Sequence, residues 1–306
     1  PLFQLNISMN IRMAFTLLLY ILPNLLIAQG LSHEWVNTWG SISNSHVFGS
    51  GIGVDAAGNT YVAGSFRSTM DADPGPGVWL LVPSGIYNVF VCKFSPSGNL
   101  LWAGAITSGS ECGAGAMKVD ALGNVLVAGY MLGTTDFDFG LGFTNLTTVG
   151  RDLFLAKYDT NGGLVWAKAL NSTSNATGLV DNDIFDMHID ATGNVYLTGT
   201  LETPIDFDPS AGTAIQTPVS SYDAFAAKYD PAGNYVLAFI LAGTSLTTSE
   251  GNGITADAAG NIYLVGAFDG TIDLDPGVGT VSVTALASSS DAFIAKYAAN
   301  GAYMWG

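Results

Sequence analysis

The sequence predicts an all-β fold built from repeats of a four-stranded antiparallel sheet. The first observation is a turn-and-strand segment that occurs four times with a period of about 67 residues, which indicates a repeat protein. The second is a tight-turn signal at eight places, and the third is the absence of helical periodicity after residue 28. The four segments are Asp55–Gly64, Asp120–Gly129, Asp190–Gly199 and Asp257–Gly266.

Two tight turns in each repeat join the expected strands. In the first repeat, Asp55 opens a turn with Gly58 three residues later, and Ser95 opens another that closes at Gly98. An Asp or Ser side chain at the first position accepts backbone hydrogen bonds, and Gly adopts positive φ at little cost. Such turns connect antiparallel neighbours, so strand one should pair with two and strand three with four. The other turns are Asp120–Gly123, Asp190–Gly193, Asp257–Gly260, Asp159–Gly162, Asp230–Gly233 and Ala298–Gly301.

The strands follow in the same order in every repeat, and the repeats start near residues 51, 116, 186 and 253. Strand two leaves the first turn, a polar segment with Asp-x-Asp follows, and strand three ends in Lys and an aromatic residue. Strand four carries Trp102, Trp166 or Trp305, whereas the third repeat has Leu237 there. Four strands in each unit favour the blades of a β-propeller over a sandwich or barrel. The expected third strands are Asn88–Phe94, Asp152–Tyr158, Asp223–Tyr229 and Asp291–Tyr297.

The two ends of the predicted repeat domain, residues 29–306, bear on the number of blades. His33–Gly40 resembles a fourth strand that precedes the first repeat, and Trp305 lies in the fourth strand of the last one. Two interpretations stay open. Either the four repeats belong to a larger ring, or four blades close with one redundant strand.

Residues 1–28 are typical of a signal peptide for export. Arg12 is the basic residue of its first part, and the apolar run Ala14–Leu22 is too short for a membrane span of about 20 residues. Met9 or Met13 is the expected start, with upstream read-through before it. The sequence therefore predicts a cleaved signal and a secreted or cell-surface protein, with an uncleaved anchor or a buried segment as the alternative.

The repeat motif resembles that of a known family. Its parts are Val-Asp-x-x-Gly-Asn-x-Tyr-Val, Asp-Phe-Asp-Pro, Asp-Ala-Phe-x-Ala-Lys-Tyr and Asn-Gly-x-x-x-Trp. Together they are similar to SBBP β-propeller repeats, and the first half also resembles NHL repeats. The resemblance covers residues 34–306 and implies a propeller in a secreted bacterial protein. It implies no particular activity, because the family has none in common.

Composition limits the partners. Lys and Arg number 9 against 25 Asp and Glu, a formal net charge of −16, so a nucleic-acid backbone would be repelled. Two cysteines, Cys92 and Cys112, do not make a disulfide framework. Cys92 occupies a position that is Ala in the other repeats, so a small buried thiol is preferred, although an exported protein also permits a Cys92–Cys112 disulfide.

Four Asp-x-Asp pairs are the candidate metal ligands. Alternate residues of a strand face the same side, so each pair presents two carboxylates together, and Ca²⁺ prefers several such oxygens. Pro follows three of the pairs, and the complete Asp-x-Asp-x-Asp-Gly loop of calcium sites is missing, so a purely structural loop is the alternative. The eight residues are Asp71, Asp73, Asp136, Asp138, Asp206, Asp208, Asp273 and Asp275.

A lysine recurs at one position of strand three. We expect each of these lysines to form an ion pair with a carboxylate, and the Asp-x-Asp loop is the expected partner; a solvated lysine is the alternative. No catalytic residue is expected, because the histidines share no repeat position and no Asp/Glu pair suggests acid and base roles. The lysines are Lys93, Lys157, Lys228 and Lys296, and the histidines are His33, His46 and His188.

The sequence thus predicts a non-catalytic extracellular binding or scaffold module with a protein or glycan ligand. No nucleic acid, no cofactor other than Ca²⁺ and no membrane span after signal cleavage are expected. The alternatives are a secreted propeller enzyme acting on polysaccharide and a calcium-stabilised adhesin. An enzyme should break the repeat symmetry, and the most irregular stretch is Asn171–Asp186, with Asp181, Asp183 and Asp186.

Overall fold

The structure, a computed structural model, describes residues 34–38, 40–41, 46–148, 150–173, 182–244, 246–286 and 289–306. The chain divides into two units, Pro1–Asn37 and Thr38–Gly306, and the features below belong to the second. The expected signal at 1–28 lies outside the described residues, so export stays a prediction. No helix among the described residues has the length and hydrophobicity needed to cross a bilayer.

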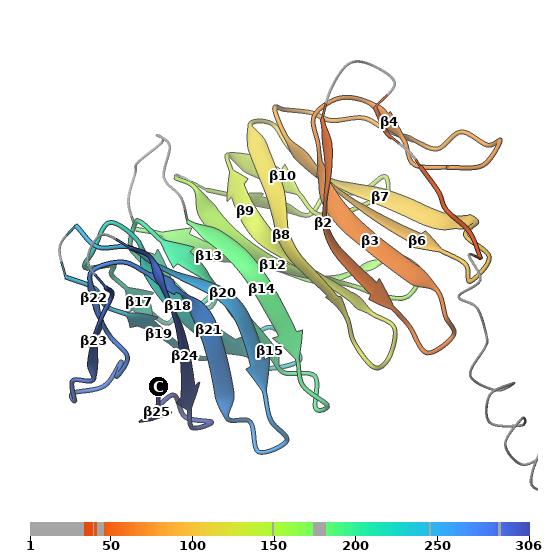
Figure 1. The fold of residues 1–306 in the computed structure, drawn as a ribbon. Coiled ribbons are helices and arrows are strands. Elements are labelled where there is room, and N and C mark those ends of the chain that lie inside the picture. The colour runs from red at the N-terminus through yellow and green to blue at the C-terminus, as the bar shows by residue number, and fades with distance from the viewer. Residues whose placement is uncertain are drawn as a thin grey trace, which may run out of the picture. The chain divides into compact units, whose positions relative to one another are not determined.

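Each repeat folds into a four-stranded antiparallel sheet, here called a blade, whose strands are neighbours in chain order (Figure 1). The architecture is therefore all-β and propeller-like, as predicted, and a larger ring stays a prediction. Blade 1 consists of β2 (Val47–Val54), β3 (Thr60–Phe66), β6 (Asn88–Phe94) and β7 (Leu100–Ser108), and blade 2 of β8 (Glu111–Val119), β9 (Val125–Leu132), β12 (Asp152–Tyr158) and β13 (Leu164–Ser172). Blade 3 consists of β14 (Asp183–Ile189), β15 (Val195–Leu201), β18 (Asp223–Tyr229) and β19 (Tyr235–Leu241), and blade 4 of β20 (Ser249–Ala256), β21 (Ile262–Phe268), β24 (Asp291–Tyr297) and β25 (Tyr303–Trp305).

The eight turns form where the Asp-x-x-Gly pattern places them. In the first turn of blade 1, Gly58 has a φ of 81° and donates its N–H to Asp55 O at 2.9 Å. Asp55 Oδ1 accepts the N–H groups of Ala57 at 3.0 Å and Asn59 at 2.9 Å. The side chain and the glycine thus close the turn by the chemistry that the sequence predicts. All eight closing glycines have positive φ: Gly58, Gly98, Gly123, Gly162, Gly193, Gly233, Gly260 and Gly301.

Each first strand carries a β-bulge opposite a glycine of strand two. In blade 2 the register shifts between Ala114, which faces Gly129, and Ala116, which faces Ala128. A Cβ on Gly129 would collide with the carbonyl oxygen of Gly113, so only glycine lets the two strands pair there. A Cβ would meet a first-strand carbonyl oxygen in the same way at Gly64, Gly199 and Gly266.

The segment between strands two and three forms a short hairpin that joins neighbouring blades, which the sequence did not predict. The hairpin of the second repeat extends the sheet of blade 1, because Asp136 pairs with Thr107 at the end of β7. The third repeat does the same on blade 2, where Asp206 pairs with Asn171. The strands of these hairpins are β4 (Met70–Asp71), β5 (Leu80–Leu81), β10 (Thr134–Asp136), β11 (Asn145–Thr147), β16 (Ile205–Asp206), β17 (Ile215–Gln216), β22 (Thr271–Asp273) and β23 (Ser282–Thr284).

The short strand β1 (Gly40–Ser41) occupies the place of a fourth strand relative to the first hairpin. Gly40 pairs with Asp71 of β4, the same pairing that the ends of β7 and β13 make with β10 and β16. The last residue of the expected preceding fourth strand, His33–Gly40, therefore behaves as predicted. Within that stretch, His33 and Trp39 lie outside the described residues.

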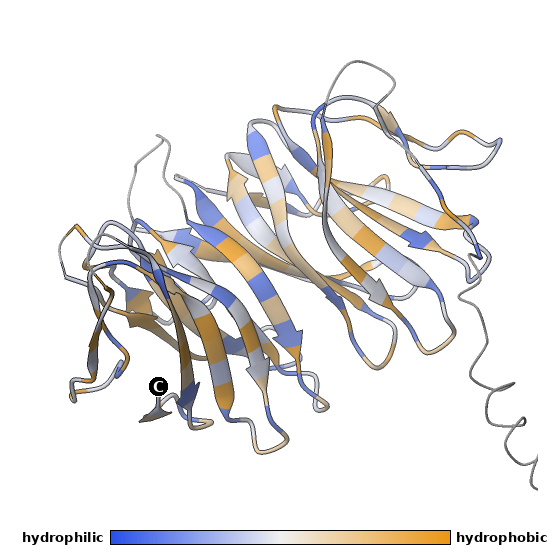
Figure 2. Cartoon of the chain, viewed as in Figure 1, coloured by the Kyte–Doolittle hydropathy of each residue, from blue (hydrophilic) through white to orange (hydrophobic). Residues whose placement is uncertain are grey.

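The hydrophobic core lies between consecutive blades. Strand β2 packs on β8, β8 on β14 and β14 on β20, and hydrophobic and hydrophilic residues alternate along the strands (Figure 2). At the first junction, Met117 of β8 joins Ala63 and Val91 of blade 1 in one buried cluster. Met117 is only 2% exposed, and burying a side chain of this size contributes about 1.5–3 kcal/mol. Blade-to-blade burial thus holds the repeats together.

Both cysteines are buried free thiols, so the disulfide alternative is wrong for this structure. Burial raises the pKa of Cys92 far above its ordinary value and that of Cys112 to about 12. Thiols held protonated in this way are poor nucleophiles and metal ligands. The preferred interpretation, a small thiol that fills an alanine position, is confirmed for Cys92.

The first residue of β12, Asp152, is a buried carboxyl with a consequence for stability. It is 2% exposed, and its Oδ1 accepts the Ser172 N–H at 2.8 Å. Burial raises the pKa of Asp152 to about 6 although the Ser172 hydrogen bond lowers it. Between about pH 4 and pH 6 the unfolded chain loses this proton before the folded chain does. Stability therefore falls as the pH rises through this window, by about 2–3 kcal/mol.

We expect Asp152→Asn to remove this pH dependence and to raise the free energy of unfolding at pH 7 by about 1–2 kcal/mol. Asn88 occupies the same position in blade 1 and accepts the Ser108 N–H at 2.9 Å, so an amide fits the place. Among the described residues, the buried Nδ2 of Asn88 has no hydrogen-bond partner. An Asn at position 152 would carry a similar cost, which offsets part of the gain in stability. Urea unfolding at pH 7 and pH 4.5 measures both effects, and an unchanged pH slope in the variant would contradict them.

Candidate functional site

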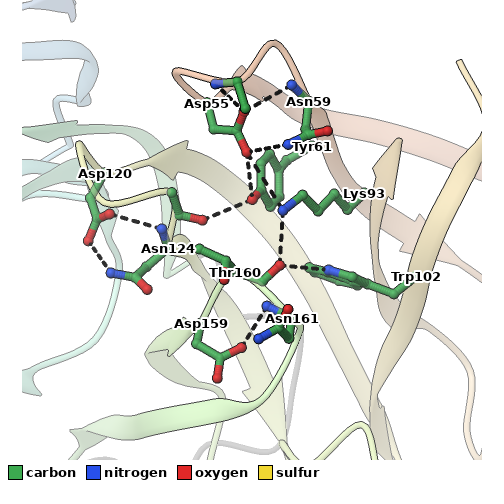
Figure 3. A network of polar contacts seen from close by, with 12 residues as sticks. Asp55, Asn59, Tyr61, Lys93, Trp102, Asp120, Asn124, Asp159, Thr160 and Asn161 are labelled. Carbon is green, nitrogen blue, oxygen red and sulfur yellow. Dashed lines mark hydrogen bonds and ion pairs between the residues drawn. The ribbon is translucent and has the colours of Figure 1, made fainter. Parts of the chain in front are cut away.

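The first turns carry a polar network that joins neighbouring blades (Figure 3). Asp55 Oδ2 accepts a hydrogen bond from Asn59 Nδ2 at 2.8 Å. The Tyr61 hydroxyl lies 3.2 Å from the same oxygen and 2.9 Å from Gly123 O of blade 2, and it donates between them. Burial raises the pKa of Asp55, but the hydrogen bonds from Asn59 and its neighbours outweigh this effect and hold the pKa below its ordinary value. The carboxylate is thus charged at neutral pH and committed to the turn.

Lysine and tryptophan extend this network to the second turn of the next blade. Lys93 Nζ lies 3.6 Å from Asp55 Oδ2 and donates to Thr160 O at 3.0 Å. Trp102 Nε1 donates to the same carbonyl oxygen at 3.1 Å (Figure 3). Thr160 belongs to blade 2, so the tryptophan that the repeat carries on strand four holds two blades together.

The predicted lysine ion pairs form in three repeats, but the predicted partner is wrong. Lys157 Nζ lies 2.9 Å from Asp120 Oδ2, and Lys296 Nζ lies 3.6 Å from Asp257 Oδ2. The carboxylates come from the first turns, because strand three pairs with strand two and its last residues return to that turn. The Asp-x-Asp hairpins lie elsewhere, against the preceding blade.

The Asp-x-Asp carboxylates hold their own hairpins together. Asp136 Oδ1 accepts the N–H groups of Asp138 at 3.1 Å and Thr144 at 2.9 Å, and Asp138 Oδ1 accepts that of Gly140 at 2.8 Å. A Cβ on Gly142 would lie 2.5 Å from Asp138 Oδ2, so the hairpin favours glycine at this position after the second Asp. The sequence analysis missed this signal. Asp71 and Asp73, Asp206 and Asp208, and Asp273 and Asp275 make the same backbone hydrogen bonds.

Calcium at these hairpins stays a prediction of the sequence. In the part of the chain that the structure describes, no group of three or more His, Cys, Asp or Glu side chains is placed to hold a metal ion. The Oδ1 atoms of the pairs accept backbone N–H groups, which accounts for the carboxylates without an ion. Thermal unfolding with and without a chelator is the measurement that checks the calcium prediction.

A cavity of about 480 Å³ lies between the first turns of blades 3 and 4. It is lined by residues 188–192, Asn194, Lys228 and residues 256–260. Asp190 and Asp257, the first residues of the two turns, are the carboxylates among its lining residues. The cavity is therefore formed by two copies of the same repeated turn.

Lys228 faces this cavity and differs from the lysines of the other repeats. It is 9% exposed, and among the described residues its Nζ makes neither an ion pair nor a hydrogen bond. Its contact is with the ring of Tyr196, whose centroid lies 5.0 Å from Nζ. A buried ammonium without a carboxylate or carbonyl partner loses hydration without compensation, so a ligand that accepts its hydrogen bonds would be stabilised here.

The first turn of this repeat also differs at its Asp, Asp190. Its Oδ1 accepts the Thr192 hydroxyl at 2.7 Å, and its Oδ2 accepts Asn194 Nδ2 at 2.8 Å and Tyr196 Oη at 3.0 Å. The corresponding residue to Thr192 is Ala57, Leu122 or Ala259 in the other repeats, none of which has a hydroxyl. Burial raises the pKa of Asp190, but the hydrogen bonds from Thr192 and Asn194 outweigh it and lower the pKa well below its ordinary value. Asp190 thus accepts one side-chain hydrogen bond that its counterparts lack, and it does so through Oδ1, whereas the lysines of the other repeats lie nearest Oδ2.

The cavity combines hydrogen-bond donors and acceptors. Lys228 can donate to a ligand, whereas the Asp190 and Asp257 carboxylates and the Thr192 hydroxyl already make hydrogen bonds within their own turns. Burial lowers the pKa of His188, so its imidazole is neutral at pH 7. Asp257 is paired with Lys296 and Asp190 lies on the same cavity as Lys228, so the charges around the cavity balance and do not attract a phosphate or a polyanion.

The carboxylates of the irregular stretch hold blades together. Asp183 Oδ1 lies 2.8 Å from Arg151 Nη2. Asp186 Oδ1 lies 3.5 Å from Lys118 Nζ, and its Oδ2 accepts the Ile254 N–H at 3.0 Å. These contacts connect β14 with blades 2 and 4, so a structural role accounts for both side chains. Residues 174–181 of the stretch, with Asp181, lie outside the described residues.

The repeated blades define the class of this chain, a repeat-containing protein with a propeller-like β fold. No protein-family model matches it. It is similar to an uncharacterized WD repeat-containing protein of Acanthamoeba polyphaga mimivirus, at 25% identity over an alignment of 269 residues that covers 76% of this chain. The chain spans 19% of that relative's length. A solved protein of unknown function from Bacteroides caccae is similar at 10% identity and a TM-score of 0.30, covering 85% of this chain and 81% of that one.

Proposed function

We propose that this chain is a non-catalytic binding and scaffold module, exported to the cell surface or the medium, with a glycan-type ligand in the cavity between blades 3 and 4. The observation that carries the proposal is Lys228, a buried ammonium that faces the cavity and, within the described part of the chain, makes no ion pair like those of its counterparts. Sugar hydroxyl groups accept hydrogen bonds without carrying a charge, so they suit the Lys228 ammonium in a cavity that Asp190 and Asp257 also line.

The rest of the polar chemistry supports a binding role rather than catalysis. The repeated carboxylates, lysines and tryptophans stabilise turns and blade junctions, as Asp55, Lys93 and Trp102 illustrate. Repeated blades that differ at one junction can provide a specific binding site there, because the other blades hold the varied residues in place. The net charge of −16 supports a partner other than nucleic acid.

Binding of neutral oligosaccharides tests the proposal. We expect a glycan array followed by isothermal titration calorimetry to find a ligand whose affinity falls at least tenfold in Lys228→Met, because the ammonium donates directly to it. Lys93→Met changes the same strand position in blade 1, away from the cavity, and should leave the affinity unchanged. A ligand that binds both variants equally, or no ligand on the array, would overturn the assignment of this cavity.

The same sugars separate binding from the enzyme alternative. A polysaccharide hydrolase would release new reducing ends during prolonged incubation, whereas a binding module leaves the ligand intact. Export has its own test, because residues 1–28 fused to a reporter should direct it out of a bacterial cytoplasm.

A further inference from the structure

The two end blades each have one face that no other described blade covers, here called the free face. The free face of blade 1 exposes a position that is buried in every other blade. Ile52 on β2 is 69% exposed. Met117, Met187 and Ile254 occupy the same place, three residues before the turn Asp, and are 2%, 1% and 5% exposed. The difference arises because each of these three packs against the blade that precedes it.

The free face of blade 4 likewise exposes positions that are buried in the other three blades. Ile294 on β24 is 55% exposed, whereas its counterparts Val91, Leu155 and Ala226 are 0% exposed. Val265 on β21 is 46% exposed, and its counterparts on strand two are also completely buried. Those counterparts are Ala63, Ala128 and Thr198. In blades 1 to 3 these positions are covered by the next blade.

An apolar hollow of about 250 Å³ opens on this face of blade 4. Gly253, Val265 and Ile294 line it, together with parts of β20 and β21. Almost all of the exposed lining is carbon, and exposed apolar patches of this kind mark interaction sites.

The first junction within the chain shows what fills such a hollow. Gly51 is the counterpart of Gly253, and a Cβ on Gly51 would lie 2.8 Å from Met117 Cβ. Met117 therefore packs on the bare backbone of Gly51, in one cluster with Ala63 and Val91. The residue that corresponds to Met117 on the free face of blade 1 is Ile52.

We propose that the free face of blade 4 binds the free face of blade 1 of a second copy of this chain, with Ile52 of that copy in the hollow at Gly253. The two faces are the two halves of a junction that the chain forms three times within itself, so the contact continues an established interface. Lys296 and the 45% exposed Trp305 then lie beside the second turn of the other copy, where Lys93 and Trp102 find their acceptor in the first junction. Each copy offers one face of each kind, so the contact is head-to-tail and closes into a ring or extends into a chain.

The mass of the chain in solution tests this inference, measured by light scattering after size-exclusion chromatography from micromolar concentration upward. The wild-type chain should show at least twice its monomer mass of 31.7 kDa. Ile52→Asp and Ile294→Asp should each be monomeric, because each buries a carboxylate in the contact. An equimolar mixture of the two variants should form a complex of two chains, since one retains an intact blade 4 face and the other an intact blade 1 face.

The control is Val165→Asp, which should associate like the wild type. Val165 is 53% exposed, and its counterparts are exposed in every blade, so it lies outside the junctions. Circular dichroism verifies folding, and Ile52→Ser and Ile294→Ser replace any Asp variant that unfolds. A wild-type chain that stays monomeric at every concentration, or a variant mixture that does not associate, would overturn the proposal.

Discussion

Replacing Lys157 by Met is expected to lower the free energy of unfolding by about 3 kcal/mol. Lys157 Nζ lies 2.9 Å from Asp120 Oδ2, and the side chains are only 12% and 7% exposed. Removing the amine leaves the Asp120 carboxylate buried without its cation, and the hydrogen bond from Asn124 Nδ2 compensates only in part. Chemical unfolding at pH 7 measures the loss.

The pH dependence gives this prediction a second readout. Burial raises the pKa of Asp120, but the hydrogen bonds from Asn124 and Lys157 outweigh it and hold the pKa below its ordinary value of 3.8. The stability that this group contributes is present above about pH 4 and is lost as the pH falls through the lowered pKa. The difference between the wild type and Lys157→Met should therefore narrow below pH 4.

Lys228→Met is the matched control at the same strand position. Lys228 makes no ion pair with a described residue, so the variant loses its contact with the Tyr196 ring and should cost under about 1 kcal/mol. Equal losses in the two variants would show that the ion pair of Lys157 is not what stabilises its junction.

Gly129→Ala is expected to destabilise the chain by about 3 kcal/mol, at the upper end of overpacking effects. A methyl group at Gly129 would collide with the carbonyl oxygen of Gly113, which belongs to the backbone of the paired strand and cannot move without breaking the ladder. Strand β8 also contacts blades 1 and 3, so its displacement would disturb two junctions. Thermal and urea unfolding measure the loss.

Gly109→Ala is the control, because it replaces glycine by alanine at a place where no collision occurs. A Cβ there meets no atom within 4 Å, and the Gly109 N–H still donates to Thr134 O. The variant should be neutral or more stable by about 0.4–1 kcal/mol, because alanine restricts the unfolded chain. Comparable destabilisation by both substitutions would contradict the collision argument.

Local features of the blade were predictable because their causes lie within a few residues. The Asp55–Gly58 turn and its three counterparts form by side-chain and glycine chemistry that the sequence displays directly. The third strands have the predicted bounds, for example Asp152–Tyr158. The burial of Cys92 followed from its alanine counterparts.

The candidate site was not predictable in the same way. Lys228 and Lys157 occupy the same place in the repeat, and the sequence analysis treated them alike. One difference between the two repeats is Thr192, whose hydroxyl donates to Asp190 Oδ1. A threonine where other repeats have an apolar residue was visible, but its effect depends on which side chains meet at the turn.

The sequence by itself determined the blades, because alternation along a strand and turn chemistry act between near neighbours. Tertiary structure alone decided which carboxylate pairs with each lysine, which blade each Asp-x-Asp hairpin joins, and where a cavity and an uncovered face remain. These contacts connect residues that belong to different strands and often to different blades, such as Lys93 and Thr160 with a separation of 67. Their distances depend on how whole sheets pack against each other, and no local pattern specifies that packing.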